Sequence, residues 1–209
     1  MAQHMLLILV AAPLLVLGTP LSPFLLALPA PARTVLGRWW KRTSWARMAW
    51  HTLTQPVVVW ALHTLALWLW HAPGPYQAAL GNESLHALEH FSFLSTALLF
   101  WWAVARTPGR RTAGQGVSTL YLFTMALQSG LLGVLITFAP QPWYPAYAAT
   151  TPAWNLTPLE DQQLAGVIMW IPAGVVYLIA ALVGLGLWLR VMERADRAMI
   201  ETAQLEITN

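Results

Sequence analysis

The sequence predicts an all-α membrane protein, built as a bundle of about five transmembrane helices. Its 209 residues are 57% hydrophobic and only 9% charged, whereas soluble domains carry about 25% charged residues. The apolar residues fall into runs close to the ~20 residues that a helix needs to cross a bilayer. There are no cysteines, which excludes disulfides, thiolate metal sites and c-type haem attachment.

The first apolar run, residues 6–18, is predicted to be a membrane helix and not a signal peptide. No Lys or Arg precedes it and five basic residues follow it, the reverse of a secretory signal. The run reaches residue 28 if the chain continues past Pro20 and Pro23, which would bend or end the helix. The other four runs cover residues 48–71, 87–105, 117–139 and 164–189.

The basic residues predict how the five helices are oriented. With five crossings all eleven Lys and Arg residues fall on one side, which is assigned to the cytoplasm because cytoplasmic loops are rich in basic residues. The N-terminus is then outside and the C-terminus inside. Every basic residue flanks an apolar run, so we expect membrane lipid, and no nucleic acid, as their partner. The three groups are Arg33, Arg38, Lys41, Arg42 and Arg47; Arg106, Arg110 and Arg111; and Arg190, Arg194 and Arg197.

The chain is predicted to form one domain. Residues 1–194 are expected to make a single transmembrane domain, and residues 195–209 a short cytoplasmic tail that mixes charged and apolar residues. The fifth apolar run carries small residues that would permit close helix packing. These are Gly166, Gly174, Ala180 and Gly184.

Four of the six histidines lie between His63 and His90. His86 and His90 are four residues apart, so on a helix both imidazoles project from one face, a spacing typical of metal ligands. His71 ends the second apolar run, and a Pro-Gly-Pro turn at residues 73–75 follows it. We therefore expect a site at the outer ends of the second and third helices.

Further polar residues gather toward the same end. His4 begins the first helix and Asp161 begins the fifth, while His63 lies eight residues before His71, ~12 Å deeper on the second helix. Ionisable groups in membrane segments are costly and tend to mark functional sites. His51, at the opposite end, is given no role. The candidate metal ligands are His4, His63, His71, His86, His90, Asp161 and Met169.

These residue types leave the metal open. His, Met and carboxylate without Cys indicate a transition metal, and imidazole suits zinc, copper, iron and nickel alike. A thioether from Met5 or Met169 would favour Cu(I). Haem is an alternative, with imidazoles from two helices as axial ligands. That requires two histidines at matching depth, and His63 has no evident partner.

The segment HALEH, residues 86–90, also matches the H-x-x-E-H pattern of zinc proteases. In that reading two histidines bind zinc and Glu89 activates water. Glu89 is only one position from His90, so we expect it to point away from the face that His86 and His90 share. The pattern is short, and the protease stays an alternative.

Several blocks in the right order resemble the CtaG family of integral membrane cytochrome c oxidase assembly factors. The resemblance covers most of the chain. The blocks are HMLLILVAAPLLVLGTP from His4, LWLWHAPGPYQAAL from Leu67, HALEHFSF from His86, LLFWW from Leu98 and DQQLAGVIMWIPAG from Asp161.

This resemblance implies a multi-pass protein of the bacterial plasma membrane that helps copper reach a haem–copper oxidase, with oxidase subunits as partners and no catalytic activity of its own. The outer-side histidines of the family correspond to His4, His71, His86 and His90. Family members often carry a further helix and a second histidine in an H-M-x-x-H arrangement ahead of this point, whereas this sequence starts at Met1. An accessory subunit of a respiratory complex without a metal is the remaining alternative.

Overall fold

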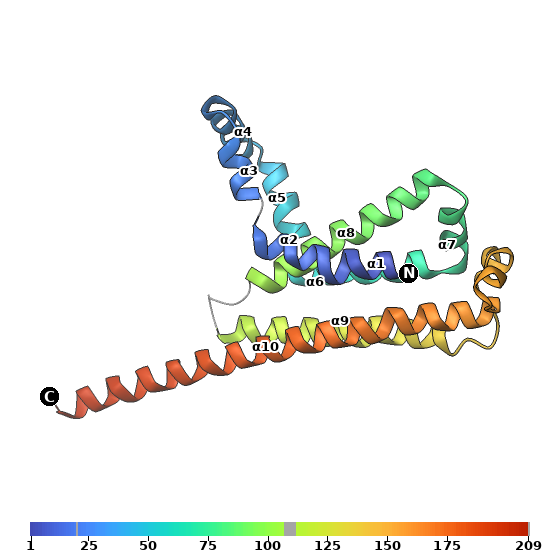
Figure 1. Cartoon of the computed structure of the whole chain (residues 1–209). Coiled ribbons are helices and arrows are strands. Elements are labelled where there is room, and N and C mark those ends of the chain that lie inside the picture. Colours follow the sequence, from blue (N-terminus) through green and yellow to red (C-terminus); the bar gives the residue numbers. More distant parts are fainter. Residues whose placement is uncertain (20, 107–111, 209) are drawn as a thin grey trace.

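The computed structural model describes residues 1–19, 21–106 and 112–208, and it contains no strand in those ranges. The predicted all-α class is therefore confirmed for the described chain. Arg110 and Arg111, two of the basic residues used above, lie outside it. The elements are α1 (Ala2–Leu6), the π-helix η1 (Leu7–Ala11), α2 (Ala12–Gly18), α3 (Leu21–Ala27), α4 (Ala30–Arg42), α5 (Ser44–Leu53), α6 (Pro56–His71), α7 (Pro73–Leu80), α8 (Glu83–Arg106), α9 (Thr112–Thr137), the 3₁₀ turns η2 (Pro145–Ala149) and η3 (Thr151–Trp154), and α10 (Pro158–Thr208) (Figure 1).

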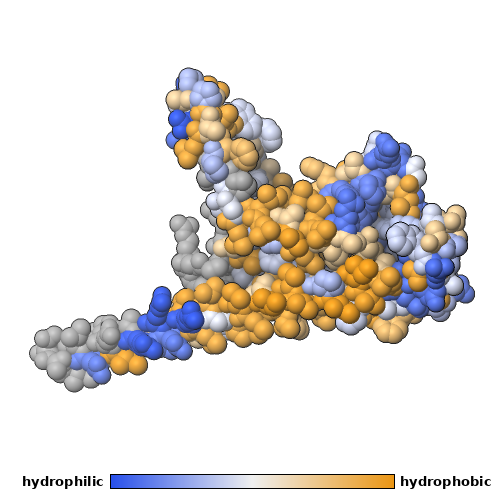
Figure 2. Space-filling view, in the orientation of Figure 1, coloured by the Kyte–Doolittle hydropathy of each residue, from blue (hydrophilic) through white to orange (hydrophobic). Residues whose placement is uncertain are grey.

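The helices form two packed groups and one projecting arm. Helices α1, α2, α6 and α8 lie side by side, and α9 and α10 form a long antiparallel pair against them (Figure 1). The core between the groups holds Phe93, Phe100, Met125 and Tyr177, all at most 2% exposed. Helices α3, α4 and α5 project away from the bundle. Figure 2 shows apolar side chains along the visible face of the bundle and hydrophilic ones toward its ends, as expected for a bundle in a bilayer.

The structure supports fewer membrane spans than the five predicted. Within the described ranges, three helices are long and apolar enough to cross a membrane, namely α8, α9 and α10. The pair α5 and α6 counts as a fourth if the bent pair is one span, and the helix Ala2–Gly18 is apolar but shorter. Membrane helices are thus confirmed, whereas the count of five and the orientation stay predictions.

The second apolar run, predicted as one helix over residues 48–71, is broken. Helices α5 and α6 meet at 68°. The break precedes Pro56, which is the first residue of α6, and Gln55 is extended at φ −66°, ψ 131°. A proline disfavours the helical conformation of the residue before it, which explains why the chain turns here. The helix of the first run ends at Gly18, the predicted bound, and does not continue to residue 28, because Thr19 adopts a left-handed conformation at φ 41°.

Helix α10 runs for 51 residues and includes Pro172 in its interior. It continues through residue 194, where we placed the end of the transmembrane domain, into the predicted tail. The tail is therefore an extension of α10. Its place in the cytoplasm stays a prediction.

Glycines let α9 and α10 approach closely at two points. A Cβ on Gly166 would collide with Thr137 Oγ1 and would lie 2.8 Å from the Thr137 backbone nitrogen and 2.9 Å from the Gly133 carbonyl oxygen. A Cβ on Gly133 would lie 2.5 Å from the Cβ of Trp170. These backbone and Cβ atoms can move only if the helices themselves move, so the contacts fix the distance between α9 and α10.

We expect Gly166→Ala to lower the free energy of unfolding by about 1–3 kcal/mol, because the added methyl forces α9 and α10 apart. The matched control is Gly174→Ala on the same helix, where a Cβ meets nothing within 4 Å. That variant should be neutral or slightly stabilising, since alanine is the better helix former. Thermal unfolding in detergent measures both, and equal melting temperatures would contradict this packing.

Candidate metal centre

The first turns of α8 carry His86, Glu89 and His90. Asn82 caps this helix, because its Oδ1 accepts hydrogen bonds from the backbone nitrogens of Ser84 at 2.9 Å and Leu85 at 3.1 Å. A side-chain acceptor at this position satisfies donors that a helix start leaves unpaired. The cap therefore fixes the register in which the three side chains are presented.

His4 on α1 meets His90 on α8. Their Nε2 atoms are 3.0 Å apart and the rings pack edge to face at a centroid distance of 4.8 Å. His4 is 5% exposed. The two Nε2 atoms share a hydrogen bond in this structure. Two nitrogens each ~2.0 Å from one tetrahedral metal ion are ~3.3 Å apart, so an ion could replace the shared proton after a small separation of the rings. The structure thus joins two of the predicted ligands from helices far apart in the sequence.

Glu89 also belongs to this group, contrary to our expectation that it points away. Its Oε1 lies 3.7 Å from His4 Nε2 and its Oε2 lies 3.7 Å from His86 Nδ1. The residue is 2% exposed. Glu89 is one position from His90 and so does not share its helical face. It is three residues from His86, however, and that spacing places Glu89 and His86 on the same face. We call His4, His86, Glu89 and His90 the histidine cluster.

The cluster is open on one side. The His86 side chain is 44% exposed, and the His86 and His90 rings lie 4.4 Å apart by centroid. Both line a hollow of about 320 Å³ between α7 and α8. An ion could reach these two imidazoles from outside the bundle, while His4 and Glu89 close the inner side.

His71 lies next to the cluster and is buried. Its Nδ1 donates to the Leu67 carbonyl at 2.7 Å, which leaves the lone pair on Nε2, and Nε2 has no hydrogen-bond partner. The Phe93 ring contacts both histidines, at centroid distances of 5.8 Å from His71 and 4.8 Å from His4. His71 is therefore a neighbour of the cluster, separated from direct contact in this arrangement.

The loop between α9 and α10 closes over His71. The Tyr144 hydroxyl donates to the His71 carbonyl at 2.7 Å, and the Tyr76 and Tyr147 hydroxyls are hydrogen-bonded at 3.0 Å. Burial raises the pKa of both Tyr76 and Tyr144, so both phenols stay protonated. The tyrosines hold the end of α6 in place.

The cluster and His71 contain buried polar atoms without partners. These are His4 Nδ1, His71 Nε2 and Glu89 Oε1. Buried polar groups are nearly always hydrogen-bonded. A bound ion would explain the unpaired Glu89 Oε1 and, if His71 moved toward it, His71 Nε2; it would not explain His4 Nδ1, which points away from the Nε2 that faces His90. Among the residues that the structure describes, no three His, Cys, Asp or Glu side chains are already arranged around one ion. The donor set fits a transition metal in type and in the His4–His90 spacing, and further ligands would have to move in.

The other three candidates lie away from the cluster. His63 is fully buried, bonds to Thr96 Oγ1 through Nδ1 at 2.9 Å and stacks on Phe100 at 5.7 Å. Met169 is part of the hydrophobic core. Asp161 lines a separate hollow of about 260 Å³ beside Tyr76 and Tyr144.

The acidic residue before Asp161 caps α10. The Thr157 backbone nitrogen and hydroxyl both donate to Glu160 Oε2 at 2.8 Å, and the Glu160 nitrogen donates to Thr157 Oγ1 at 3.2 Å. This reciprocal arrangement is a capping box. It assigns Glu160 to the start of the helix, so only Asp161 of the acidic pair is left for a role elsewhere.

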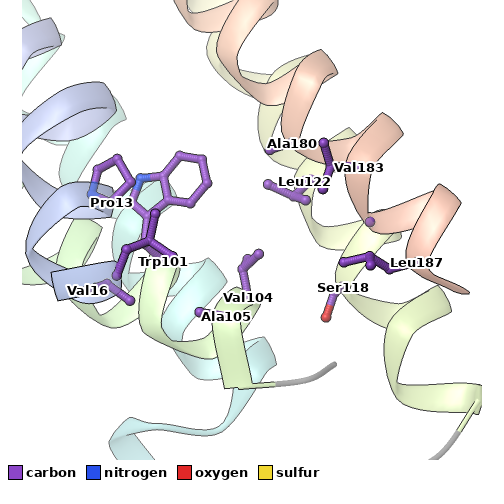
Figure 3. Close-up of a pocket in the computed structure, with 12 residues that line it drawn as sticks. Pro13, Val16, Trp101, Val104, Ala105, Ser118, Leu122, Ala180, Val183 and Leu187 are labelled. Carbon is purple, nitrogen blue, oxygen red and sulfur yellow. The ribbon is translucent and has the colours of Figure 1, made fainter. Parts of the chain in front are cut away.

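A third cavity, of about 360 Å³, lies at the other end of the helices, among α2, α8, α9 and α10. Figure 3 shows Pro13, Trp101, Leu122 and Leu187 turned toward it, and the polar side-chain atoms of its lining belong to Ser118 and Trp101. It carries no His, Asp or Glu. This cavity cannot supply metal ligands, so the histidine cluster remains the candidate centre.

The comparison with protein families finds a match over most of the chain. The family described as cytochrome c oxidase caa3 assembly factor (Caa3_CtaG) matches residues 1–191. No curated protein and no solved structure matches the chain. The matched range includes all four residues of the histidine cluster and His71.

Proposed function

Because the chain belongs to the Caa3_CtaG family of cytochrome c oxidase assembly factors, we propose that it binds copper at the histidine cluster and assists the insertion of copper into a haem–copper oxidase. The resemblance noted in the sequence is thereby confirmed at the level of the family. The observation that carries the copper proposal is the 3.0 Å approach of His4 Nε2 to His90 Nε2 beside the buried Glu89.

The cluster is buried on one side and open on the other, an arrangement suited to a metal ion that is bound and later released. His4 and Glu89 are buried, whereas His86 faces an open hollow. A metal enclosed on all sides exchanges slowly, while one with an accessible side can pass to another set of ligands. Imidazole is a ligand that copper accepts, and the Glu89 carboxylate offsets the positive charge of a buried cation. The role proposed is delivery, not catalysis.

The proposed arrangement in the bacterial plasma membrane has the cluster at the outer face. The basic residues whose backbone the structure describes lie on the arm, at the end of α8 and at the far end of α10, all away from the cluster. By the rule that cytoplasmic segments are basic, that end faces inside. Counting Ala2–Gly18 and α6 as spans gives the five crossings. Each is ~24–26 Å long, slightly short of the ~30 Å hydrocarbon core, a mismatch that local bilayer thinning accommodates.

The geometry favours a single ion over haem. Two axial nitrogens on opposite sides of a haem iron are about 4 Å apart with the porphyrin between them. The Nε2 atoms of His4 and His90 are 3.0 Å apart, which leaves no room for the ring. His63, the deeper histidine, stacks on Phe100 and bonds to Thr96 through Nδ1, and its Nε2 has no hydrogen-bond partner.

Elemental analysis and a visible absorption spectrum of the protein purified from membranes test the proposal. We expect about one copper per chain and no Soret band, with the copper lost on treatment with a chelator and regained on adding Cu(I). A Soret band would instead indicate a haem carrier. Zinc without copper would favour a zinc site, and the absence of any metal after Cu(I) addition would leave only a structural role in oxidase assembly.

A further inference from the structure

Helices α4 and α5, residues 30–53, form a projecting unit that we call the basic arm. It leaves the bundle where α2 ends and runs across the direction of the bundle helices (Figure 1). Its second helix, α5, meets α6 at 68°. Because α6 belongs to the membrane bundle, the arm runs closer to the plane of the membrane than to its normal.

Helix α4 carries one apolar and one basic face. One side of the helix carries two adjacent pairs of apolar residues, and the pairs are four residues apart. They are Val35 and Leu36, followed by Trp39 and Trp40. All four are exposed, at 39–61%. The opposite side carries Thr34, Arg38 and Lys41.

Helix α5 repeats this pattern. Trp45, Ala49 and Leu53 recur every four residues, and Met48 lies beside them. Trp45 is 67% exposed and Met48 is 69% exposed. Arg47 and His51 lie on the other side. No residue of either helix is buried, and apart from the ring of Trp40, which packs against Trp50, both apolar faces are exposed.

The arm is also strongly positive. It carries Arg33, Arg38, Lys41, Arg42 and Arg47 and no Asp or Glu. A helix with aromatic and aliphatic residues on one face and Lys or Arg on the other is typical of segments that lie in the membrane interface. Tryptophan favours this depth, and basic residues attract anionic headgroups.

Side-chain contacts join α5 to α4 and attach the arm to the last turns of α8. The Arg47 guanidinium donates to the Lys41 carbonyl and, at 3.5 Å, to the Trp40 carbonyl, joining α5 to the end of α4. The rings of Trp40 and Trp50 pack at a centroid distance of 6.4 Å, and Trp50 packs on Trp102 of α8 at 5.7 Å. Trp102 is four residues from the end of α8 at Arg106. The arm therefore lies at the end of a membrane-spanning helix, where the headgroup layer is expected.

We propose that the basic arm lies flat in the headgroup layer at the end of the bundle away from the histidine cluster, with its apolar faces inserted among the lipids and its basic residues bound to anionic phospholipid headgroups. An acidic protein surface would match the charge but would leave the tryptophan-bearing faces in water. A bilayer surface accounts for both faces of both helices. This inference does not depend on copper binding.

The absence of cysteine makes a direct test simple. Single cysteines at Val35 and Met48, on the apolar faces, and at Thr34 and Ser44, outside them, are labelled with bimane in the full-length protein. The labelled proteins are placed in nanodiscs of phosphatidylcholine with a minor fraction of either dibrominated phosphatidylglycerol or dibrominated phosphatidylcholine. Bromine quenches bimane only at short range, so quenching reports which lipid lies beside the arm.

We expect strong quenching at positions 35 and 48 and weak quenching at 34 and 44. At positions 35 and 48 dibrominated phosphatidylglycerol should quench severalfold more than dibrominated phosphatidylcholine. The triple variant Arg38→Gln, Lys41→Gln, Arg42→Gln should remove this preference, since each basic residue near an anionic surface contributes roughly a fivefold factor. The control variant Arg190→Gln, Arg194→Gln on α10 should retain it.

Two outcomes would overturn the proposal. Equal, weak quenching at all four positions would show that the arm stands in water, available to a protein partner. Equal quenching by the two brominated lipids at positions 35 and 48 would show insertion without recognition of anionic headgroups.

Discussion

Replacing both His86 and His90 by Ala is expected to abolish stoichiometric copper binding. His90 supplies the Nε2 atom that lies 3.0 Å from His4 Nε2, and His86 supplies the imidazole at the open hollow. Without them the cluster retains one histidine and one carboxylate. One imidazole binds a transition metal far more weakly than three, so binding should fall below detection in a titration of the purified protein with Cu(I) and a competing chelator.

The same double variant should still insert and fold. His86 and His90 are partly exposed in the first turns of α8, and neither is part of the hydrophobic core. Helix content and melting temperature should therefore stay near those of the parent protein. His51→Ala is the control, because His51 lies on the exposed helix α5 at the other end of the bundle. If the double variant binds copper as the parent does and restores oxidase activity in a deletion strain, the site is elsewhere.

The spacing rules that predicted this pair also explain what the sequence analysis missed. His86 and His90 were found because residues four apart share a helical face. Glu89 was misplaced because the equally valid spacing of three residues, from His86 to Glu89, was not applied. The break before Pro56 was likewise readable from the sequence, since a residue that precedes proline is driven out of the helical conformation.

Other features could not be derived from spacing. The approach of His4 to His90 joins residues 86 positions apart, and it depends on how α1 rotates against α8. Topology predicts only that both lie at the same end of the bundle. For the same reason the sequence could not show that Phe93 lies against both His4 and His71. Nor could it show that the loop tyrosines hold the end of α6.

Replacing Glu89 is the second change for which we expect a large effect on copper binding. We expect Glu89→Gln to weaken copper binding by about 10–100-fold, the usual cost of altering a group that orients metal-binding imidazoles. The substitution keeps the size of the side chain and removes its charge. In the parent protein the two carboxylate oxygens lie 3.7 Å from nitrogens of His4 and His86, where they can orient both rings and offset the charge of a bound cation. The amide can do neither equally well.

The metal-free protein distinguishes this role from a structural one. Glu89 is buried and its Oε1 has no hydrogen-bond partner. The imidazole nitrogens of His4 and His86, at 3.7 Å, are beyond hydrogen-bond distance, so they offset only part of the cost of burying a carboxylate. Glu89→Gln should therefore leave the melting temperature of the metal-free protein unchanged or raise it, while the stabilisation that copper adds should shrink. Glu193→Gln, on the exposed far part of α10, is the matched control and should alter neither quantity. A lower melting temperature with unchanged copper affinity would assign Glu89 to packing, because a carboxylate that only supports the fold has no reason to respond to the metal.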